Sequence, residues 1–212
     1  MSGFDKDLVV LVPDKNLEAT LRGLLSRPQA LSIREISFDV FIQSDRDPGC
    51  LRRSQDFLRP MCRRYTHGLV VFDRMGCGQE KKVREALEVE VSARLAASGW
   101  EERAAAVVVD PELEAWVWSD SPEVDRSLGW VATATEPNLR GWLESRGFWE
   151  VGQAKPGDPK GAVEEVLRYV RRPRSSSIYG ELARKVSFRR CQDGSFQALQ
   201  DHLRRWFRKE EQ

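Results

Sequence analysis

The sequence has 212 residues and a mass of 24.3 kDa, of which 41% are hydrophobic and 32% charged, with a formal net charge of +1. This composition excludes a disordered chain and a uniformly basic nucleic-acid-binding protein, and the length predicts one domain, or one domain with a small appendage. The chain lacks an apolar run near the roughly 18 residues that cross a bilayer, and its acidic start, MSGFDKD, does not resemble a signal peptide. We therefore expect a globular protein of the cytoplasm that does not contact the membrane.

Cysteine spacing excludes two further classes of small protein, and the charge is unevenly distributed along the chain. The four cysteines are scattered without a CxxC pair, which argues against both a zinc ribbon and a disulfide scaffold. Residues 160–212 carry 13 Lys and Arg against 7 Asp and Glu, a net charge of +6, which leaves a net charge of −5 on residues 1–159. The tail is basic and the body is acidic.

The first half of the chain alternates short apolar runs, which predict buried strands, with helical patterns. The predicted strands cover residues 8–12, 33–42, 69–72 and 104–109, and the predicted helices cover 16–25, 51–65, 79–98 and 112–118. Continuous apolar strands that alternate with helices are typical of an α/β fold. We expect a mostly parallel central sheet flanked by helices.

The rest of the chain predicts loops followed by a helical end. Residues 119–158 are rich in Ser, Pro, Gly and Trp and contain one short helical pattern at 139–145. The last predicted helices cover residues 162–171, 178–186 and 195–207, and the Arg- and Ser-rich run 171–177 is interpreted as a solvated link. We therefore expect an α/β domain over residues 1–158 and a small basic helical appendage, packed on it, over residues 159–212.

Acidic side chains follow every predicted strand. They are Asp14, Asp45, Asp47, Asp73, Asp110 and Glu112. Because ligands of open α/β sheets bind beyond the carboxyl ends of the strands, these acids are expected to meet at one crevice. Clustered carboxylates repel one another and are tolerated when they hold a divalent cation, and hard oxygen ligands suit Mg²⁺ or Mn²⁺. The alternative is that Asp is simply common at turns and helix caps.

Four phrases of the sequence resemble a known family. They are LVVLVPDKNLEATLRGLL, GLVVFDRMGCG, VVDPELEAWVWSD and the C-terminal IYGELARKV…SFQALQDHL. Together they resemble the Toprim-like proteins of bacterial phage-defence loci, which are relatives of the OLD-type and RloB nucleases, and in particular a group with an E-x-E-A-W signature and a helical tail. The resemblance extends over nearly the whole chain and implies a Toprim-like fold in a defence system of the methylation-associated kind.

The resemblance also implies a metal site. Toprim proteins carry a Glu after the first strand and an Asp-x-Asp after a later one, which bind Mg²⁺ and assist the cutting or joining of phosphodiesters. Asp14 stands near the Glu position and Asp73 takes the first Asp, but Met75 occupies the second, and a thioether is a poor ligand for Mg²⁺. The E-A-W phrase adds Glu114, with Glu112 beside it, and on a helix these two side chains point about 200° apart, so that one of them can face the crevice.

Two functions follow from this reading. In the first, the protein is a metal-dependent nuclease in which Asp73, Glu112 and Glu114 bind Mg²⁺ or Mn²⁺ and Asp14, Asp47 and Asp73 form the catalytic set. Arg204, Arg205 and Arg208 of the basic tail then bind DNA or RNA. In the second, a catalytically inactive Toprim-like scaffold docks other proteins of a defence operon, or a second copy of itself. Met75 favours the scaffold, and the acid at every strand end favours the enzyme.

Overall fold

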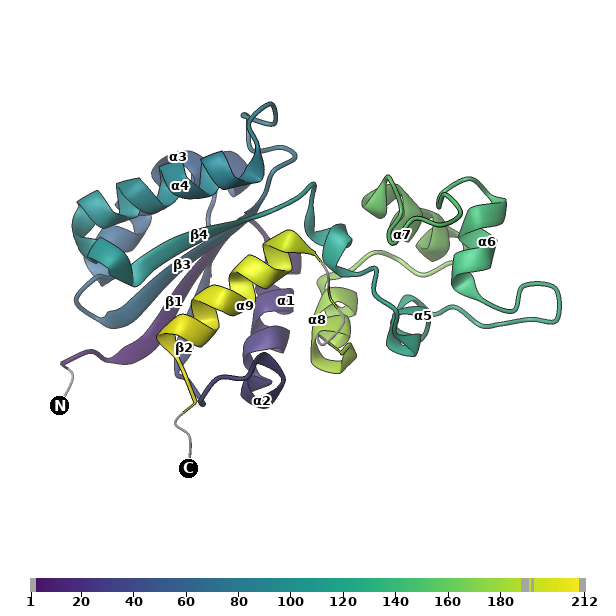
Figure 1. Cartoon of the computed structure of the whole chain (residues 1–212), viewed down its shortest axis with the longest axis horizontal. Coiled ribbons are helices and arrows are strands. Elements are labelled where there is room, and N and C mark those ends of the chain that lie inside the picture. The colour runs from purple at the N-terminus through teal and green to yellow at the C-terminus, as the bar shows by residue number, and fades with distance from the viewer. Residues whose placement is uncertain (1–2, 188–190, 192, 210–212) are drawn as a thin grey trace.

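The computed structural model describes residues 3–187, 191 and 193–209. Its centre is a four-stranded sheet in the order β2-β1-β3-β4 with every pair of strands parallel (Figure 1). The strands are β1 (Lys6–Val12), β2 (Phe38–Ile42), β3 (Tyr65–Asp73) and β4 (Ala104–Val109). An α/β fold with a parallel sheet flanked by helices is therefore confirmed.

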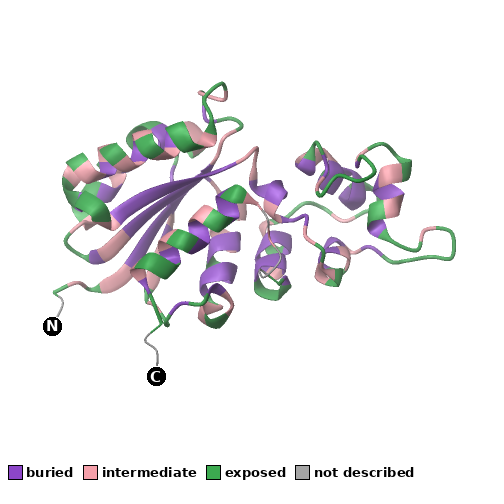
Figure 2. Ribbon diagram, in the orientation of Figure 1, coloured by how far each residue is buried: buried purple, intermediate pink, exposed green. Residues whose placement is uncertain are grey.

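Both faces of the sheet are covered by helices, which explains why its strands are continuous apolar runs. Side chains alternate between the two faces along each strand, so that Leu8 and Val10 of β1 pack into one core while Val9 and Leu11 pack into the other. Helices α3 (Arg46–Leu58) and α4 (Arg84–Leu95) cover the second of these faces. Figure 2 shows β1, β3 and β4 buried along most of their length between the two helical layers, whereas the edge strand β2 is only partly buried.

The first face is covered by segments from both ends of the chain. Helix α1 (Lys15–Leu25) lies on it together with α9 (Gly194–Trp206), which packs on β4, and α8 (Ser176–Lys185) packs against α1 (Figure 1). Helices α1 and α8 approach each other closely at Gly23. A Cβ atom added there would lie 2.8 Å from Ala183 Cβ and 2.9 Å from the Gly180 carbonyl oxygen, so the contact requires glycine. The short helix α2 (Pro28–Leu31) follows α1.

Helices α5 (Pro122–Leu128), α6 (Leu139–Ser145) and α7 (Pro159–Tyr169) form a lobe that projects to one side of the sheet (Figure 1). Its interior is aromatic: the ring centroids of Trp130 and Trp142 lie 4.8 Å apart, and those of Trp118 and Trp149 lie 5.4 Å apart. Helix α7 thus belongs to this lobe, whereas α8 and α9 pack on the sheet layer, and the predicted division at residue 158 stays a prediction. Among the described residues, no helix is long and apolar enough to span a bilayer.

Several predicted elements have different bounds in the structure. The predicted helix 79–98 begins at Arg84, because the preceding loop is held by a hydrogen bond of 2.5 Å from Arg74 Nη1 to the Glu80 carbonyl oxygen. The predicted helix 112–118 is a single 3₁₀ turn, η4 (Leu113–Trp116). The chain also forms other short turns, η1 (Arg59–Met61), the π-helical η2 (Ala96–Trp100) and η3 (Glu101–Arg103).

Two further differences have physical reasons. Helix α5 was not predicted, although Ser121 caps it, Pro122 begins it and Gly129 ends it at φ +83°, which are the usual signals of a short helix. The predicted strand 33–42 pairs with β1 only over Phe38–Ile42, because Ile33 forms an isolated antiparallel bridge with Arg208 instead.

Candidate functional site

All the strand-end acids lie at one edge of the sheet, because the strands are parallel and their carboxyl ends coincide. Asp14 follows β1 and caps α1: its Oδ1 accepts hydrogen bonds of 2.9 Å from the backbone N–H groups of Asn16 and Leu17. Asp47 lies in the first turn of α3, and Asp73 is the last residue of β3. The structure therefore places all three predicted catalytic residues at this edge.

Glu114, a predicted metal ligand, is instead a partner of the C-terminal helices. It is 1% exposed, and its Oε1 accepts a hydrogen bond of 2.5 Å from the Tyr179 hydroxyl and forms an ion pair with Arg174. Burial and the charge of Glu114 raise the pKa of Tyr179 far above its ordinary value. The link 171–177 is mostly exposed, as interpreted from the sequence, and its Arg174 pairs with the buried Glu114.

Three other strand-end acids are also neutralised. Glu112 forms an ion pair of 2.9 Å with Lys160 at the start of α7, and Asp110 forms one of 2.7 Å with Arg74. Asp45, which precedes α3, pairs with Arg53. Each of these carboxylates has a cationic neighbour that balances its charge.

Asp73 differs from these acids. Its Oδ1 is buried and has no hydrogen-bond partner in the part of the chain that the structure describes. Burial, followed by repulsion from the charges of Asp47, Glu114, Asp14 and Glu112, raises the pKa of Asp73 well above its ordinary value. The five predicted site acids are therefore close enough to interact electrostatically, and Asp73 is the member on which the repulsion converges.

Asp47 is the second carboxylate without a cation paired to it. Its Oδ1 accepts a hydrogen bond of 2.9 Å from the backbone N–H of Asp73, which ties the start of α3 to the end of β3. Burial raises the pKa of Asp47 to about 6, and the charge of Asp14 adds to the rise, whereas the hydrogen bond from Asp73 and the charge of Arg46 oppose it. The acids thus divide into those that form ion pairs, namely Asp45, Asp110, Glu112 and Glu114, and an unneutralised group of Asp14, Asp47 and Asp73, which form none with a described residue.

The unneutralised group offers oxygen ligands of the kind that hard divalent cations prefer. Over residues 3–187, 191 and 193–209, no group of three or more His, Cys, Asp or Glu side chains is arranged to hold a metal ion. Mg²⁺ usually keeps several waters and is bound by one or two carboxylates together with substrate phosphates. The unpartnered oxygen of Asp73 beside Asp47 fits this mode of binding, whereas an all-protein cage is not formed.

Other candidate groups at this edge are less suited to chemistry. Met75, which stands at the second Asp position of the predicted motif, is 48% exposed, and its N–H donates a hydrogen bond of 2.9 Å to the Pro111 carbonyl oxygen. Burial and then the charges of Asp47, Asp14 and Asp73 raise the pKa of the buried Cys50 thiol, which disfavours the reactive thiolate.

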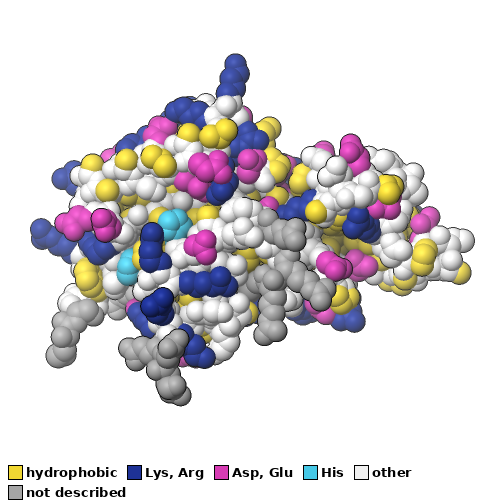
Figure 3. All heavy atoms as spheres, in the orientation of Figure 1, with side chains coloured by type: hydrophobic (Ala, Val, Ile, Leu, Met, Phe, Trp, Pro, Cys, Tyr) yellow, Lys and Arg dark blue, Asp and Glu magenta, His cyan; other side chains and the backbone are white. Residues whose placement is uncertain are grey.

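The predicted nucleic-acid-binding arginines lie at the opposite end of the sheet. Arg204 donates a hydrogen bond of 3.1 Å to the Leu31 carbonyl oxygen, and Arg208 follows α9 and bridges to Ile33. Arg205 lies 2.9 Å from His202 Nδ1. The first turn of α9 lies at η4, where Trp116 donates a hydrogen bond of 2.8 Å to the Ser195 hydroxyl, and the arginines lie roughly 15–20 Å further along the helix. In Figure 3, basic side chains gather around this far end of α9.

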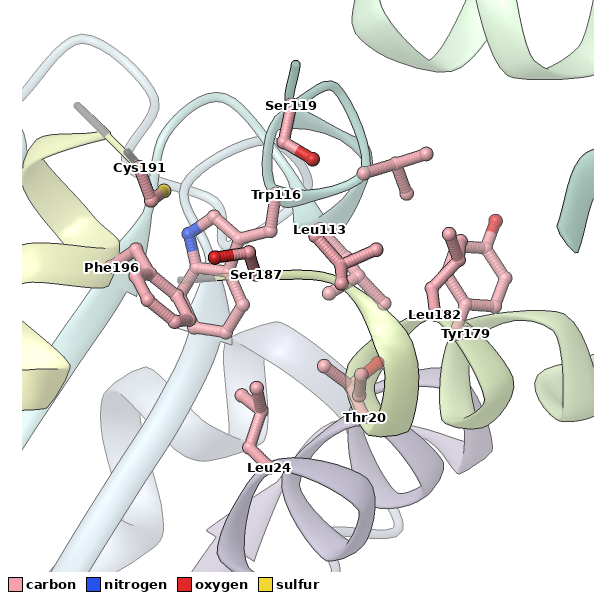
Figure 4. Close-up of a pocket in the computed structure, with 13 residues that line it drawn as sticks. Thr20, Leu24, Leu113, Trp116, Ser119, Tyr179, Leu182, Ser187, Cys191 and Phe196 are labelled. Carbon is pink, nitrogen blue, oxygen red and sulfur yellow. The ribbon is translucent and has the colours of Figure 1, made fainter. Parts of the chain in front are cut away.

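A small apolar cavity lies between η4, α1 and the C-terminal helices (Figure 4). Leu113, Trp116 and Tyr179 line it together with side chains of α1, α8 and α9. Its volume of about 40 Å³ holds a few water molecules at most, so it is too small for a nucleotide. The sequence analysis missed Lys160, Arg174 and Tyr179, because no local pattern marks a residue as the partner of an acid far away in the chain.

No protein-family model, no curated protein and no solved structure matches this chain. The resemblance to Toprim-like defence proteins stays a prediction from the sequence motifs.

Proposed function

We propose that this protein is a component of a bacterial anti-phage defence system in which the strand-end carboxylates bind Mg²⁺ or Mn²⁺ and support phosphodiester chemistry on a nucleic acid. The observation that carries the proposal is the buried Oδ1 of Asp73, which lies beside Asp47 and has no hydrogen-bond partner among the residues that the structure describes. A buried carboxylate without a partner is expensive for a fold, and a bound cation is the usual compensation. The defence context rests on the motifs of the sequence.

The proposal assigns different roles to the carboxylates of the site. Asp73 and Asp47 would hold the ion, and Asp14, fixed by its two hydrogen bonds to the start of α1, would position water or substrate. When bound, the ion polarises a phosphoryl oxygen and makes a bound water more acidic. Lys160 and Arg174 keep Glu112 and Glu114 neutralised, so that the ion is held toward Asp47 and Asp73 and not toward β4.

Compartment and partners belong to the same proposal. All four cysteines are free, which agrees with a reducing cytoplasm. The partners we propose are other proteins of the defence operon, DNA or RNA, and a second copy of the chain.

Asp73→Asn tests the proposal, with Asp110→Asn as a matched control at the same edge. Asp110 is already neutralised by Arg74, whereas Asp73 has no cation paired to it. Titration calorimetry with Mn²⁺ should detect similar binding to the unmodified protein and to Asp110→Asn. The affinity of Asp73→Asn for Mn²⁺ should be at least tenfold lower. Cleavage of labelled single-stranded DNA, duplex DNA and RNA should follow the same order. The proposal is wrong if the unmodified protein binds neither Mn²⁺ nor Mg²⁺.

A catalytically inactive scaffold is the second candidate. It is favoured by Met75 at the second Asp position and by the engagement of Glu112 and Glu114 in ion pairs. Metal binding without cleavage of any of the three nucleic acids, together with co-purification of proteins encoded by neighbouring genes, would favour it over the nuclease.

A further inference from the structure

Among the residues that the structure describes, three cationic side chains at the strand-end edge form no ion pair with an acid. Lys15 is the first residue of α1, Arg46 is the first residue of α3, and Arg52 lies one and a half turns further along α3. All three are exposed, and none forms an ion pair with a residue that the structure describes. By contrast, four other basic side chains of this edge are paired with acids: Arg53 with Asp45, Arg74 with Asp110, Lys160 with Glu112 and Arg174 with Glu114.

These three cations flank the unneutralised carboxylates from both sides. Helix α1 lies on one face of the sheet and α3 on the other, and both begin at the edge where Asp14, Asp47 and Asp73 lie. A ligand seated over the carboxylates is therefore within reach of a positive charge from each face of the sheet.

The local backbone is unusual at two of these cations. Arg46 has φ +52°, a left-handed conformation that is uncommon for a residue with a side chain and that is often found at functional sites. Arg52 lies over the turn after β3: a Cβ atom at Gly78 would lie 2.8 Å from Arg52 Nη2. Gly78, at φ +83°, thus leaves the space that the guanidinium occupies.

We propose that Lys15, Arg46 and Arg52 bind the phosphate groups of a nucleic-acid strand whose scissile phosphodiester lies over Asp47 and Asp73. The inference rests on the proposed function and names the surface that holds its substrate. Exposed cations that are not neutralised by the protein attract phosphates, and Arg forms bidentate contacts with phosphate oxygens. A divalent cation between Asp47 and Asp73 removes the repulsion between these carboxylates and the strand, so binding depends on the metal. The tail arginines, at the far end of α9, are not part of this surface.

The test compares two triple variants that remove the same charge from opposite ends of the sheet. One is Lys15→Gln/Arg46→Gln/Arg52→Gln, and the control is Arg204→Gln/Arg205→Gln/Arg208→Gln. Fluorescence anisotropy of a labelled 20-nucleotide single strand, in Ca²⁺ and at four salt concentrations, gives the affinity and its salt dependence. Each contact with a single strand contributes about 0.7 to the log–log salt slope. The first variant should therefore lower the slope by about 2 and the affinity at least tenfold, whereas the control should change neither.

A competition arm identifies the source of the phosphate. If inorganic pyrophosphate displaces the labelled strand at micromolar concentration, the surface is a nucleotide site and the proposed binding of a nucleic-acid strand is wrong. If only a second oligonucleotide displaces the labelled strand, the proposal is supported. The three side chains are exposed, so the melting temperature should not change; Arg52→Glu alone, as a charge reversal, gives the same reading if the triple variant unfolds.

The outcomes separate this inference from the proposed function. Strand binding that is lost in the first variant, with no cleavage in Mg²⁺ or Mn²⁺ by the unmodified protein, supports the surface and contradicts the catalysis. If the first variant cleaves the strand at the same rate as the unmodified protein, measured below saturating substrate, the proposed phosphate-binding surface is wrong and the proposed nuclease activity is supported. No strand binding by the unmodified protein, or a loss confined to the control variant, also overturns the inference.

Discussion

Replacing Asp47 by asparagine distinguishes a carboxylate that is kept for a ligand from one that holds the fold together. Asparagine has nearly the same shape, and its Oδ1 can still accept the hydrogen bond of 2.9 Å from the Asp73 N–H. The substitution therefore removes the charge and leaves the geometry. We expect Asp47→Asn to stabilise the protein at neutral pH in the absence of metal.

The size of the effect follows from the pKa of Asp47. Burial, helped by the charge of Asp14, raises the pKa from 3.8 to about 6. One pH unit corresponds to 1.36 kcal/mol, so the ionised carboxylate destabilises the fold by roughly 3 kcal/mol at most. Above pH 6 the group is ionised in both states and the fold bears the whole penalty, whereas below 3.8 it is protonated in both and the penalty is absent. The free energy of unfolding should thus rise as the pH falls from about 6 to 4.

Thermal and urea unfolding in EDTA, at pH 7.5 and again at pH 4.5, measure this effect. At pH 7.5 we expect Asp47→Asn to gain about 1–3 kcal/mol, and each kcal/mol is worth about 2–4 °C in a protein of this size. At pH 4.5 most of the gain should disappear. Mn²⁺ should then stabilise the unmodified protein more than the variant, because a ligand that binds the folded state shifts the unfolding equilibrium.

Asp39→Asn is the control for these measurements. Asp39 accepts hydrogen bonds of 2.8 Å from Lys6 Nζ and 2.6 Å from the Tyr65 hydroxyl, and these bonds lower its pKa. Its replacement should therefore lower stability at pH 7.5, the opposite sign to Asp47. If Asp47→Asn also destabilises the protein at pH 7.5, Asp47 is a structural residue of the α3 turn and our account of the unneutralised group is wrong.

Three further substitutions test the packing of the site and of the helices beside it. Glu114→Ala should lower the free energy of unfolding by about 1–3 kcal/mol, because it leaves the buried hydroxyl of Tyr179 without its acceptor; unchanged stability in urea would contradict this structural role of Glu114. Gly23→Ala should lower it by about 1–3 kcal/mol by forcing α1 away from α8. Gly180→Ala in the same contact, where the nearest atoms would lie at 3.4 Å, should be neutral or stabilising by up to about 1 kcal/mol, and equal effects of the two would contradict the close crossing.

The sequence predicts the sheet well because its strands are buried on both faces. The runs at residues 8–12 and 104–109 are continuous and apolar, and both are strands in the structure. Strand ends and loop conformations are predicted less well, since they depend on contacts made elsewhere. The loop before α4 is held by Arg74, and the start of the predicted strand 33–42 is taken by a bridge to Arg208. No pattern in the neighbouring sequence predicts either contact.

The acids at the strand ends could be found from the sequence, but their partners could not. The ion pair between Glu112 and Lys160 joins residues 48 apart, and that between Glu114 and Arg174 joins residues 60 apart. Hydrophobic periodicity reports which face of an element is buried and carries no information on which distant cation meets a given carboxylate. The sequence therefore predicts one crevice of equivalent acids, whereas the structure shows two groups with different electrostatic states.

The difference between Glu114 and Asp73 argues for a ligand. Both follow neighbouring strands and both have buried oxygens, but Glu114 has a hydroxyl and a guanidinium bonded to Oε1, whereas Asp73 Oδ1 has no donor among the described residues. A buried carboxylate that is ionised without a partner destabilises a fold by several kcal/mol, which is a large part of the 5–15 kcal/mol that separates folded from unfolded chains. Asparagine, serine or a cationic neighbour at this edge would remove the penalty without disturbing the strand. The arrangement around Asp73 is therefore unfavourable for stability alone and becomes favourable when a cation occupies the edge between Asp73 and Asp47.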